Sequence, residues 1–297
     1  NPMPKNLLSF ASILYLLIAC NPKPATYQLV YLTDQHAPDL ELYLLDLDGN
    51  QTRLYGDTTL SIYGMTPHES GDFLLFRGWE QDDANLYKLD LHSRKVTDYI
   101  RTSYNEGGAD MDDSGNLVYT SNKDHEKAEM YLRKADGTEK RITFNEGWDM
   151  APRFSPDGQL VAYCSQVTLP DSTDHAGNGE IIVYDIEKDI NTQITYREGF
   201  DCLPDWSPDG RQITFHGCEG EGCQILVINA DGTNQRQITS GNDNRWPRWS
   251  PDGKWIAYTS VRNDQTDIYL IKPDGSEEIQ LTKAPGRDEV AEWIIAP

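Results

Sequence analysis

Short apolar runs separated by turn residues recur along the chain from about residue 27 onward. Runs such as Trp255–Tyr258 and Ile268–Ile271 are rich in β-branched and aromatic residues, and Gly, Pro or Asp residues bound them. Runs of this length and composition predict strands rather than helices. Three of the intervening segments read Ser-Pro-Asp-Gly, in which Pro presets φ and Gly accepts a positive φ, as a tight turn requires. The pattern therefore predicts an all-β chain.

The strand pattern repeats along the chain at a nearly constant interval. Residues 149–163, 201–215 and 244–258 are almost superimposable in sequence. The turn glycines are separated by 44, 43, 52 and 43 residues, and they are Gly71, Gly115, Gly158, Gly210 and Gly253. A period of about 40 to 45 residues is typical of β-propeller blades, each a four-stranded sheet that cannot bury its faces alone.

We predict a six-bladed β-propeller of four-stranded antiparallel blades over residues 27–297. Five repeats are expected at about 61–105, 106–147, 148–199, 200–241 and 242–284. The N-terminal segment supplies only three strands, at 29–32, 41–45 and 52–55. Residues 288–293 match the first strand of a repeat, so we expect this C-terminal strand to complete the first blade and close the ring, leaving no open sheet edge.

The N-terminal segment has the pattern of an export signal. After Lys5 an apolar run extends from Leu7 to Ala19, too short to cross a bilayer as an ordinary helix. It ends in Leu17-Ile18-Ala19-Cys20, which resembles the lipobox of bacterial lipoproteins. This resemblance implies a signal peptide at 1–20, a lipid on Cys20, a tether at 21–26, and a protein anchored in the bacterial envelope, at the outer membrane, with a periplasmic or cell-surface face. A plain secretory signal with an incidental Cys is the alternative.

The repeated unit (Asn/Asp)-x-x-Pro-x-(Trp/Phe)-Ser-Pro-Asp-Gly resembles the PD40, or WD40-like, repeat of the TolB-like propeller family over roughly residues 27–297. The resemblance implies the propeller fold, here as a propeller-only lipoprotein. Similar blades occur in oligogalacturonate lyases and in the propeller domains of prolyl oligopeptidases, so the motif alone does not fix the function.

Acidic residues dominate the charge, with 48 Asp and Glu against 26 Lys and Arg and a formal net charge of −22. Nucleic acids are thereby excluded as partners, because their binding depends on cationic side chains. One acidic or amide residue recurs where the first strand of a repeat enters the channel mouth: Glu106, Asp149, Asp201, Asn244 and Asp288. These side chains could receive a segment of an envelope protein, which the TolB resemblance favours, or a hard cation such as calcium. Alternatively, each caps its own strand entry as an Asx-turn.

The loops between the second and third strands share the face of the channel mouth. The longest, Val167–Glu180, accounts for the 52-residue interval and is expected to carry specificity. The loop residues predicted to bind a partner are Asp124, His125, Asp174 and His175. His36, His125 and His175 are candidate metal ligands for the alternative function, a metal-dependent glycan lyase or hydrolase similar to oligogalacturonate lyases.

Catalytic motifs do not support an enzyme. The chain has neither the Gly-x-Ser-x-Gly elbow nor a phosphate-binding loop, and no catalytic residue is assigned. We therefore expect a monomer that binds an envelope protein or peptide without catalysis, with a purely structural envelope module as a further alternative. Export permits disulfides. Cys218 and Cys223 flank a hairpin loop and are predicted to pair, whereas Cys164 and Cys202 either pair or remain buried thiols.

Overall fold

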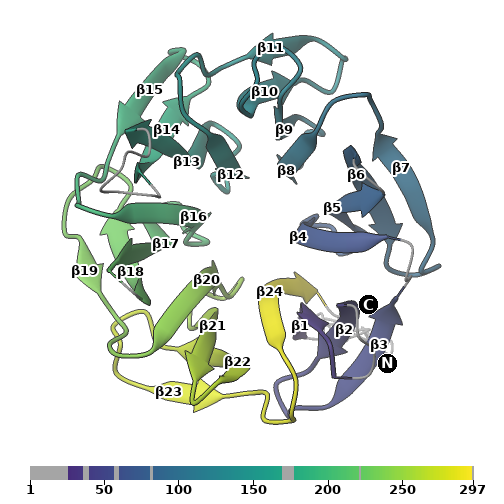
Figure 1. The fold of residues 1–297 in the computed structure, drawn as a ribbon, viewed down its shortest axis with the longest axis vertical. Helices are drawn as coiled ribbons and strands as arrows, with labels where there is room; N and C mark the ends of the chain where they lie inside the picture. The colour runs from purple at the N-terminus through teal and green to yellow at the C-terminus, as the bar shows by residue number, and fades with distance from the viewer. Residues whose placement is uncertain are drawn as a thin grey trace, which may run out of the picture.

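The computed structural model describes residues 26–35, 40–56, 60–80, 83–168, 177–220 and 222–295. All regular structure in these residues is β-strand, and no helix in them could span a membrane. The sheets are arranged radially about one axis, as in a propeller (Figure 1). The predicted signal peptide, Cys20 and the tether to residue 25, together with His36, Asp174 and His175, lie outside the described residues.

Four of the sheets have four strands each. One contains β1 (Tyr27–Thr33), β2 (Glu41–Leu45), β3 (Gln51–Tyr55) and β24 (Asp288–Ile295). The next contains β4 (Ser61–Pro67), β5 (Phe73–Glu80), β6 (Asp83–Asp90) and β7 (Val96–Ile100). The third contains β8 (Glu106–Met111), β9 (Leu117–Ser121), β10 (Glu129–Arg133) and β11 (Glu139–Arg141). The fourth contains β20 (Asp243–Trp249), β21 (Ile256–Arg262), β22 (Gln265–Ile271) and β23 (Glu278–Gln280).

The remaining strands form one eight-stranded sheet. Its first four are β12 (Asp149–Phe154), β13 (Leu160–Thr168), β14 (Asn178–Asp185) and β15 (Ile190–Gln193). Its last four are β16 (Phe200–Trp206), β17 (Gln212–Glu219), β18 (Gly222–Asn229) and β19 (Arg236–Gln237).

The prediction of six separate four-stranded antiparallel blades is therefore wrong: the described residues form four four-stranded sheets and one of eight strands. The two predicted blades at 148–199 and 200–241 merge through a parallel pairing of Gly179 with Phe200, supported by a bond from the Gly179 N–H to the Gly199 carbonyl of 3.3 Å. The pairing joins the start of β14 to the start of β16, both of which lie at the same end of the propeller. The all-β propeller architecture itself agrees with the prediction.

The ring is closed by the two ends of the chain, as predicted. β24 pairs antiparallel with β1 from Tyr27 opposite Ile295 to Thr33 opposite Asp288. Figure 1 shows this C-terminal strand innermost in its sheet, next to the N-terminal strands. β1 is therefore not an edge strand, and β24 takes the innermost position that the first strand holds in the other four-stranded sheets.

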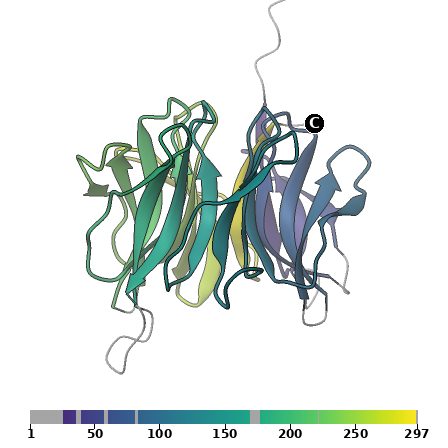
Figure 2. The same ribbon diagram turned by 90° about the horizontal axis from the view of Figure 1, so that it is seen from above.

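The two ends of the propeller differ in what they carry (Figure 2). The first strand of each repeat begins at one end, which we call the loop face, and finishes at the Ser-Pro-Asp-Gly turns of the other end, the turn face. Near the loop face most first strands contain a bulge with a residue in the left-handed region: Gly64, Ala151, Leu203, Trp246 and Val290. These bulges bend the innermost strands where they line the channel.

Candidate functional site

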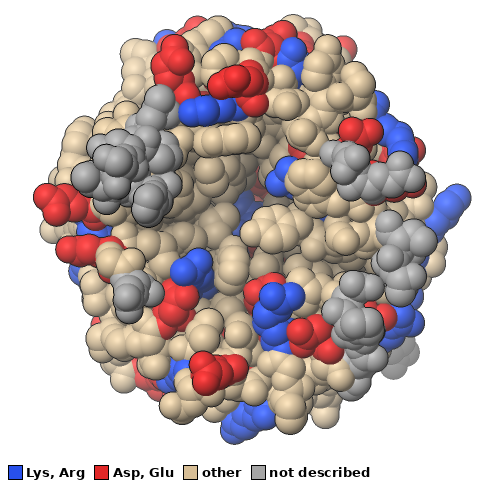
Figure 3. Space-filling model, in the orientation of Figure 1, with Lys and Arg blue, Asp and Glu red and all other residues tan. Residues whose placement is uncertain are grey.

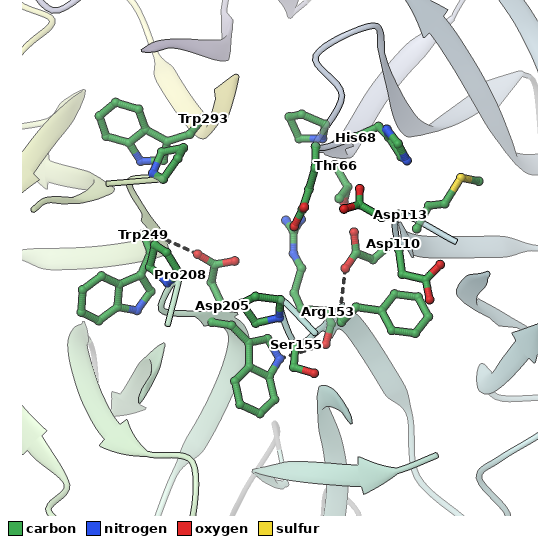
Figure 4. Close-up of a pocket in the computed structure, with 18 of the residues that line it drawn as sticks. Thr66, His68, Asp110, Asp113, Arg153, Ser155, Asp205, Pro208, Trp249 and Trp293 are labelled. Atoms are coloured by element: carbon green, nitrogen blue, oxygen red, sulfur yellow. Dashed lines mark hydrogen bonds between the residues drawn. The ribbon is translucent and has the colours of Figure 1, made fainter. Parts of the chain in front are cut away.

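Charged side chains of alternating sign form a ring in the central channel. They occupy one position of the repeat, which lies five residues before the turn glycine in the repeats that have one, and just before the aromatic residue in the last four. Charged residues hold this position in five repeats, as Asp110, Arg153, Asp205, Arg248 and Glu292, and the uncharged Thr66 holds it in the sixth. All six line one cavity, and Figure 4 shows Asp110, Arg153 and Asp205 turned toward it.

Glu292 is the central acceptor of this ring. Its Oε1 lies 2.5 Å from Nη2 of Arg153 and 2.6 Å from Nε of Arg248, and all three residues are buried. The ion pairs connect β24, at the chain's closing end, to β12 and β20. Two indoles extend the connections, because Trp206 donates to the Arg153 carbonyl and Trp293 to the Arg248 carbonyl, each at 3.1 Å.

The two aspartates of the ring join neighbouring repeats. Asp110 accepts a 2.7 Å hydrogen bond from the backbone N–H of Phe154, and Asp205 accepts one of 2.7 Å from that of Trp249. Burial raises the pKa of the Asp205 carboxyl to about 6, although Arg248 opposes the shift. The ring thus acts as an internal clamp that holds the repeats to one another.

A cavity of about 580 Å³ opens above this ring on the turn face. Trp206, Trp249 and Trp293 contribute to its wall, and Glu69, Asp112 and Asp113 to its rim. Burial, followed by the neighbouring Asp113 carboxylate, raises the pKa of Glu69. Tyr27 also lines the cavity, so the chain enters the propeller at the turn face.

The five predicted channel-mouth residues lie near the loop face, but all are buried. Both carboxylate oxygens of Asp149 accept hydrogen bonds from Asn145 Nδ2, at 2.8 and 2.9 Å. Those of Asp288 accept from Gln35 Nε2 at 2.8 Å. Thus both carboxylates hold a loop next to their own strand.

The other three mouth residues are bonded in the same manner. Glu106 accepts from the Thr102 hydroxyl at 2.6 Å, and Asp201 accepts from Arg197 Nη1 at 3.0 Å. Asn244 accepts from the Ser260 hydroxyl at 2.7 Å and donates to Gly241 O. In this geometry each mouth residue accepts from a neighbouring side chain, whereas the expected Asx-turn would accept from a backbone N–H. The five residues are buried, and in the described structure they do not form an open acidic ring.

Stability should depend on pH through Asp201. Burial raises the pKa of this carboxyl to about 7, with Arg197 opposing the shift. The folded state thus holds a proton that the unfolded chain has released, so the stabilisation is complete below about pH 4 and is lost as pH rises through 7. We expect urea unfolding between pH 5 and 8 to show a steeper loss of stability in the wild type than in Asp201→Asn. Asp98→Asn, at an exposed position, is the control and should keep the wild-type pH dependence. Equal pH dependence of stability in the wild type and in Asp201→Asn would contradict this assignment.

Of the predicted histidine ligands, only His125 belongs to the described residues. Its Nδ1 lies 3.9 Å from Glu129 Oε1, which also pairs with Arg141 at 2.8 Å, while Asp124 accepts from the Tyr131 hydroxyl. A metal-ligand-like group in the described chain comprises His216, Cys218 and Cys223, but the two cysteines form a disulfide and their sulfurs are not thiolates. Cys164 and Cys202 are free and buried.

Large aromatic side chains are exposed on the loop face, which Figure 3 views with its hollow centre. Phe144 is 74% exposed and Tyr196 is 77% exposed, each in a segment leading into the first strand of a repeat. Tyr63, Tyr104 and Trp148 are also exposed and lie at or just before such strand starts. The exposed surface of the loop face therefore includes several aromatic side chains, whereas the carboxylates predicted there are buried.

Sequence reasoning missed both of these features. The alternating ring occupies the variable position of the repeat motif, and its signal is visible as Asp, Arg, Asp, Arg and Glu in successive repeats. The aromatic residues lie in loops of unequal length, where the repeat gives no register. Nothing in the sequence distinguishes them from core aromatics.

The radial sheets, the repeat motif and the ring closure define a β-propeller of the WD40-like kind. The PD40 family, described as the TolB beta propeller domain, matches residues 25–293, and the chain belongs to this family. An uncharacterised protein of Agrobacterium fabrum is 29% identical over 188 residues, which cover 59% of this chain and 57% of that protein. The Tol-Pal system protein TolB of Gluconobacter oxydans is 32% identical over 128 residues, covering 42% and 26%.

Solved structures share the fold at low identity. TolB from Acinetobacter baumannii superposes with a TM-score of 0.75 at 18% identity, over 90% of this chain and 66% of that one. An oligogalacturonate lyase in complex with manganese has a TM-score of 0.56 at 20% identity, over 87% and 74%. The chain spans 57% or less of the length of these curated relatives, so the likeness does not extend to their whole architecture.

Proposed function

We propose that this chain is an exported envelope protein that binds a protein or peptide partner at its loop face and channel mouth, without catalysis. Membership of the TolB propeller family supports a binding role, since two of the relatives are named as Tol-Pal system proteins. We assign the partner to the loop face because a group of aromatic residues is exposed there: Tyr63, Tyr104, Phe144, Trp148 and Tyr196.

Exposed aromatic side chains favour protein recognition over a bare structural role. Aromatic residues are enriched at interfaces, and the few side chains that dominate binding are often Trp, Tyr and Arg. The Arg141 guanidinium lies 4.7 Å from the ring centroid of Phe144, so a cation stands beside exposed apolar surface. The buried mouth residues support this face by holding the loops that carry the aromatics: Asn145, bonded to Asp149, follows Phe144 directly.

The proposed lipid anchor at Cys20 agrees with this orientation. The chain enters the propeller at Tyr27 on the turn face, and the residues between Cys20 and Tyr27 can span at most about 25 Å. An anchored propeller would therefore hold its turn face toward the membrane. The loop face would point away from the bilayer, accessible to a partner.

Affinity capture from gently crosslinked envelopes of the source organism tests the binding role. We expect the wild type to retain a stoichiometric protein and a Phe144→Ser/Tyr196→Ser double variant to retain at least tenfold less, because truncating central aromatic contacts costs about 1 to 4 kcal/mol.

The same cells test the anchor: the full-length chain should sediment with membranes and Cys20→Ser should not.

A matched control removes similar apolar surface elsewhere. Leu47 and Ile190 are both exposed and lie away from the loop-face aromatics, so Leu47→Ser/Ile190→Ser should capture the partner normally. Equal capture by both double variants would contradict the assignment of the binding face. These exposed positions are preferable to Asp149 and Asp201, whose substitution would disturb buried hydrogen bonds.

A further inference from the structure

Arg77 lies among aromatic side chains close to the channel mouth. It stands on β5 directly opposite Tyr63 of β4, and its guanidinium carbon is 4.6 Å from the ring centroid of Trp79. The Tyr63 hydroxyl is near enough to act electrostatically on the guanidinium. We call Tyr63, Arg77 and Trp79 the Arg77 cluster. Since β4 begins and β5 ends at the loop face, the cluster lies in that half of the sheet.

Arg77 is half-buried, yet it has neither an ion pair nor a hydrogen bond to any of the residues described here. Its Nε is buried without a partner, and burial lowers the pKa of the guanidinium. Other loop-face arginines are paired: Arg141 with Glu129 and Arg262 with Glu278. An unpaired, partly desolvated cation is costly. It is unexpected in a chain with 22 more acidic than basic residues.

The strand beside the Arg77 cluster has no side chain at its bulge position. This position holds Ala151, Leu203, Trp246 and Val290 in other repeats, but Gly64 and Gly108 in the β4–β7 and β8–β11 sheets. A Cβ added at Gly64 would meet no heavy atom within 4 Å. Tyr63, which stands opposite Arg77, is itself exposed and has no side chain next to it at position 64.

We propose that Arg77 receives a carboxylate of the partner, presented beside an aromatic or large apolar side chain that packs on Tyr63. This inference rests on the proposed function and specifies the chemistry of its partner. A guanidinium binds a carboxylate through two parallel N–H bonds, and stacking on Trp79 fixes the plane of that fork. Either the C-terminal carboxylate of a chain or an Asp or Glu side chain supplies this group.

Charge explains why one carboxylate suffices. The acidic surface repels an acidic partner at long range, so a single carboxylate at the unpaired Arg77 sets the register of a largely apolar or basic segment. Burial of the pair beside Trp79 and Tyr63 would also satisfy the orphan Nε.

Titration of the full chain with small probes tests the site directly. Three probes are used. N-acetyl-phenylalanine carries an α-carboxylate, the C-terminal α-amide of N-acetyl-phenylalanyl-glutamate keeps only the side-chain carboxylate, and N-acetyl-phenylalaninamide is neutral. We expect the Arg77 Nε–H resonance, assigned by its loss in Arg77→Lys, to shift saturably with at least one carboxylate probe and not with the amide. Affinity should fall at least tenfold in Arg77→Gln, and Arg101→Gln, which removes an exposed and already paired arginine, should bind like the wild type.

Three results would overturn the inference: equal binding of the amide, equal binding of inorganic phosphate, which would indicate a general anion site, or undiminished binding by a folded Arg77→Gln. The carboxylate probe with the higher affinity identifies whether the site takes a C-terminal carboxylate or an Asp or Glu side chain. The capture experiment separates this inference from the proposed function. If the wild type and Arg77→Gln retain the partner equally and Phe144→Ser/Tyr196→Ser loses it, the inference about Arg77 is wrong and the proposed function is supported. Failure of the wild type to capture any partner, with normal probe binding, would instead count against the proposed function alone.

Discussion

A chain that ends at residue 287 is expected to lose cooperative folding. The deletion removes β24, which supplies the innermost strand of the first sheet and pairs with β1 along nearly its whole length. It also removes Trp293 and Ile294, both buried, and Glu292, the acceptor for two channel arginines. Because an exposed inner edge and unpaired buried charges then remain together, the ring has no stable closed form. Urea unfolding followed by near-ultraviolet circular dichroism should show no sharp transition.

Two comparisons make this deletion specific. A chain that ends at residue 295 keeps β24 and should unfold like the wild type. A synthetic peptide of residues 286–297, added to the shorter chain, should restore part of the transition, because the missing strand pairs through backbone bonds that do not require a covalent connection. A sharp, wild-type-like transition of the 287-residue chain without peptide would show that closure by β24 is dispensable.

Replacing Glu292 by Gln should lower the free energy of unfolding by about 3 to 5 kcal/mol, because removing one partner of a buried ion pair leaves the other charges uncompensated. Glu292 neutralises Arg153 and Arg248 together, at 2.5 and 2.6 Å. The amide keeps the shape and some hydrogen-bonding capacity but removes the negative charge. Chemical unfolding at pH 7 measures the change.

The control is Glu277→Gln, which removes an exposed carboxylate and should change stability by no more than about 0.5 kcal/mol. A five-fold variant tests the cause. It combines Glu292→Met, Arg153→Met and Arg248→Met with Asp110→Asn and Asp205→Asn, whose amide oxygens can still accept from the backbone of Phe154 and Trp249. Replacing a whole buried ionic group by apolar residues of similar size is often neutral, so this variant should recover most of the loss. If Glu292→Gln is as stable as the control, the clamp role assigned to the ring is incorrect.

Features that repeat locally could be predicted from the sequence. The Ser-Pro-Asp-Gly turns carry their own conformational preferences, and Gly158, Gly210 and Gly253 adopt the positive φ that such turns need. The match of residues 288–293 to a first strand was enough to predict that β24 would pair with β1. The hairpin around Cys218 and Cys223 placed two cysteines opposite each other, and they form a disulfide.

Features that depend on distances between repeats could not be predicted in this way. The fusion of two expected blades into one sheet depends on the approach of Gly179 to Phe200, and residue spacing does not report the distance between two repeats. The mouth carboxylates were placed near the correct end of the channel, but their burial depends on partners such as Gln35, 253 residues away from Asp288 in sequence.

The repeated motif was sufficient to predict the all-β propeller, its turn positions and the closure of its ring, because each of these depends on residues that are neighbours in the chain or repeat at a fixed period. Which charges meet depends on the folded ring. Arg153, Arg248 and Glu292 come from three different repeats and form one buried cluster, whereas Arg77 is left without a partner. Coulombic and hydrogen-bonding energies act over a few ångströms in space, and that proximity exists only once the ring has closed.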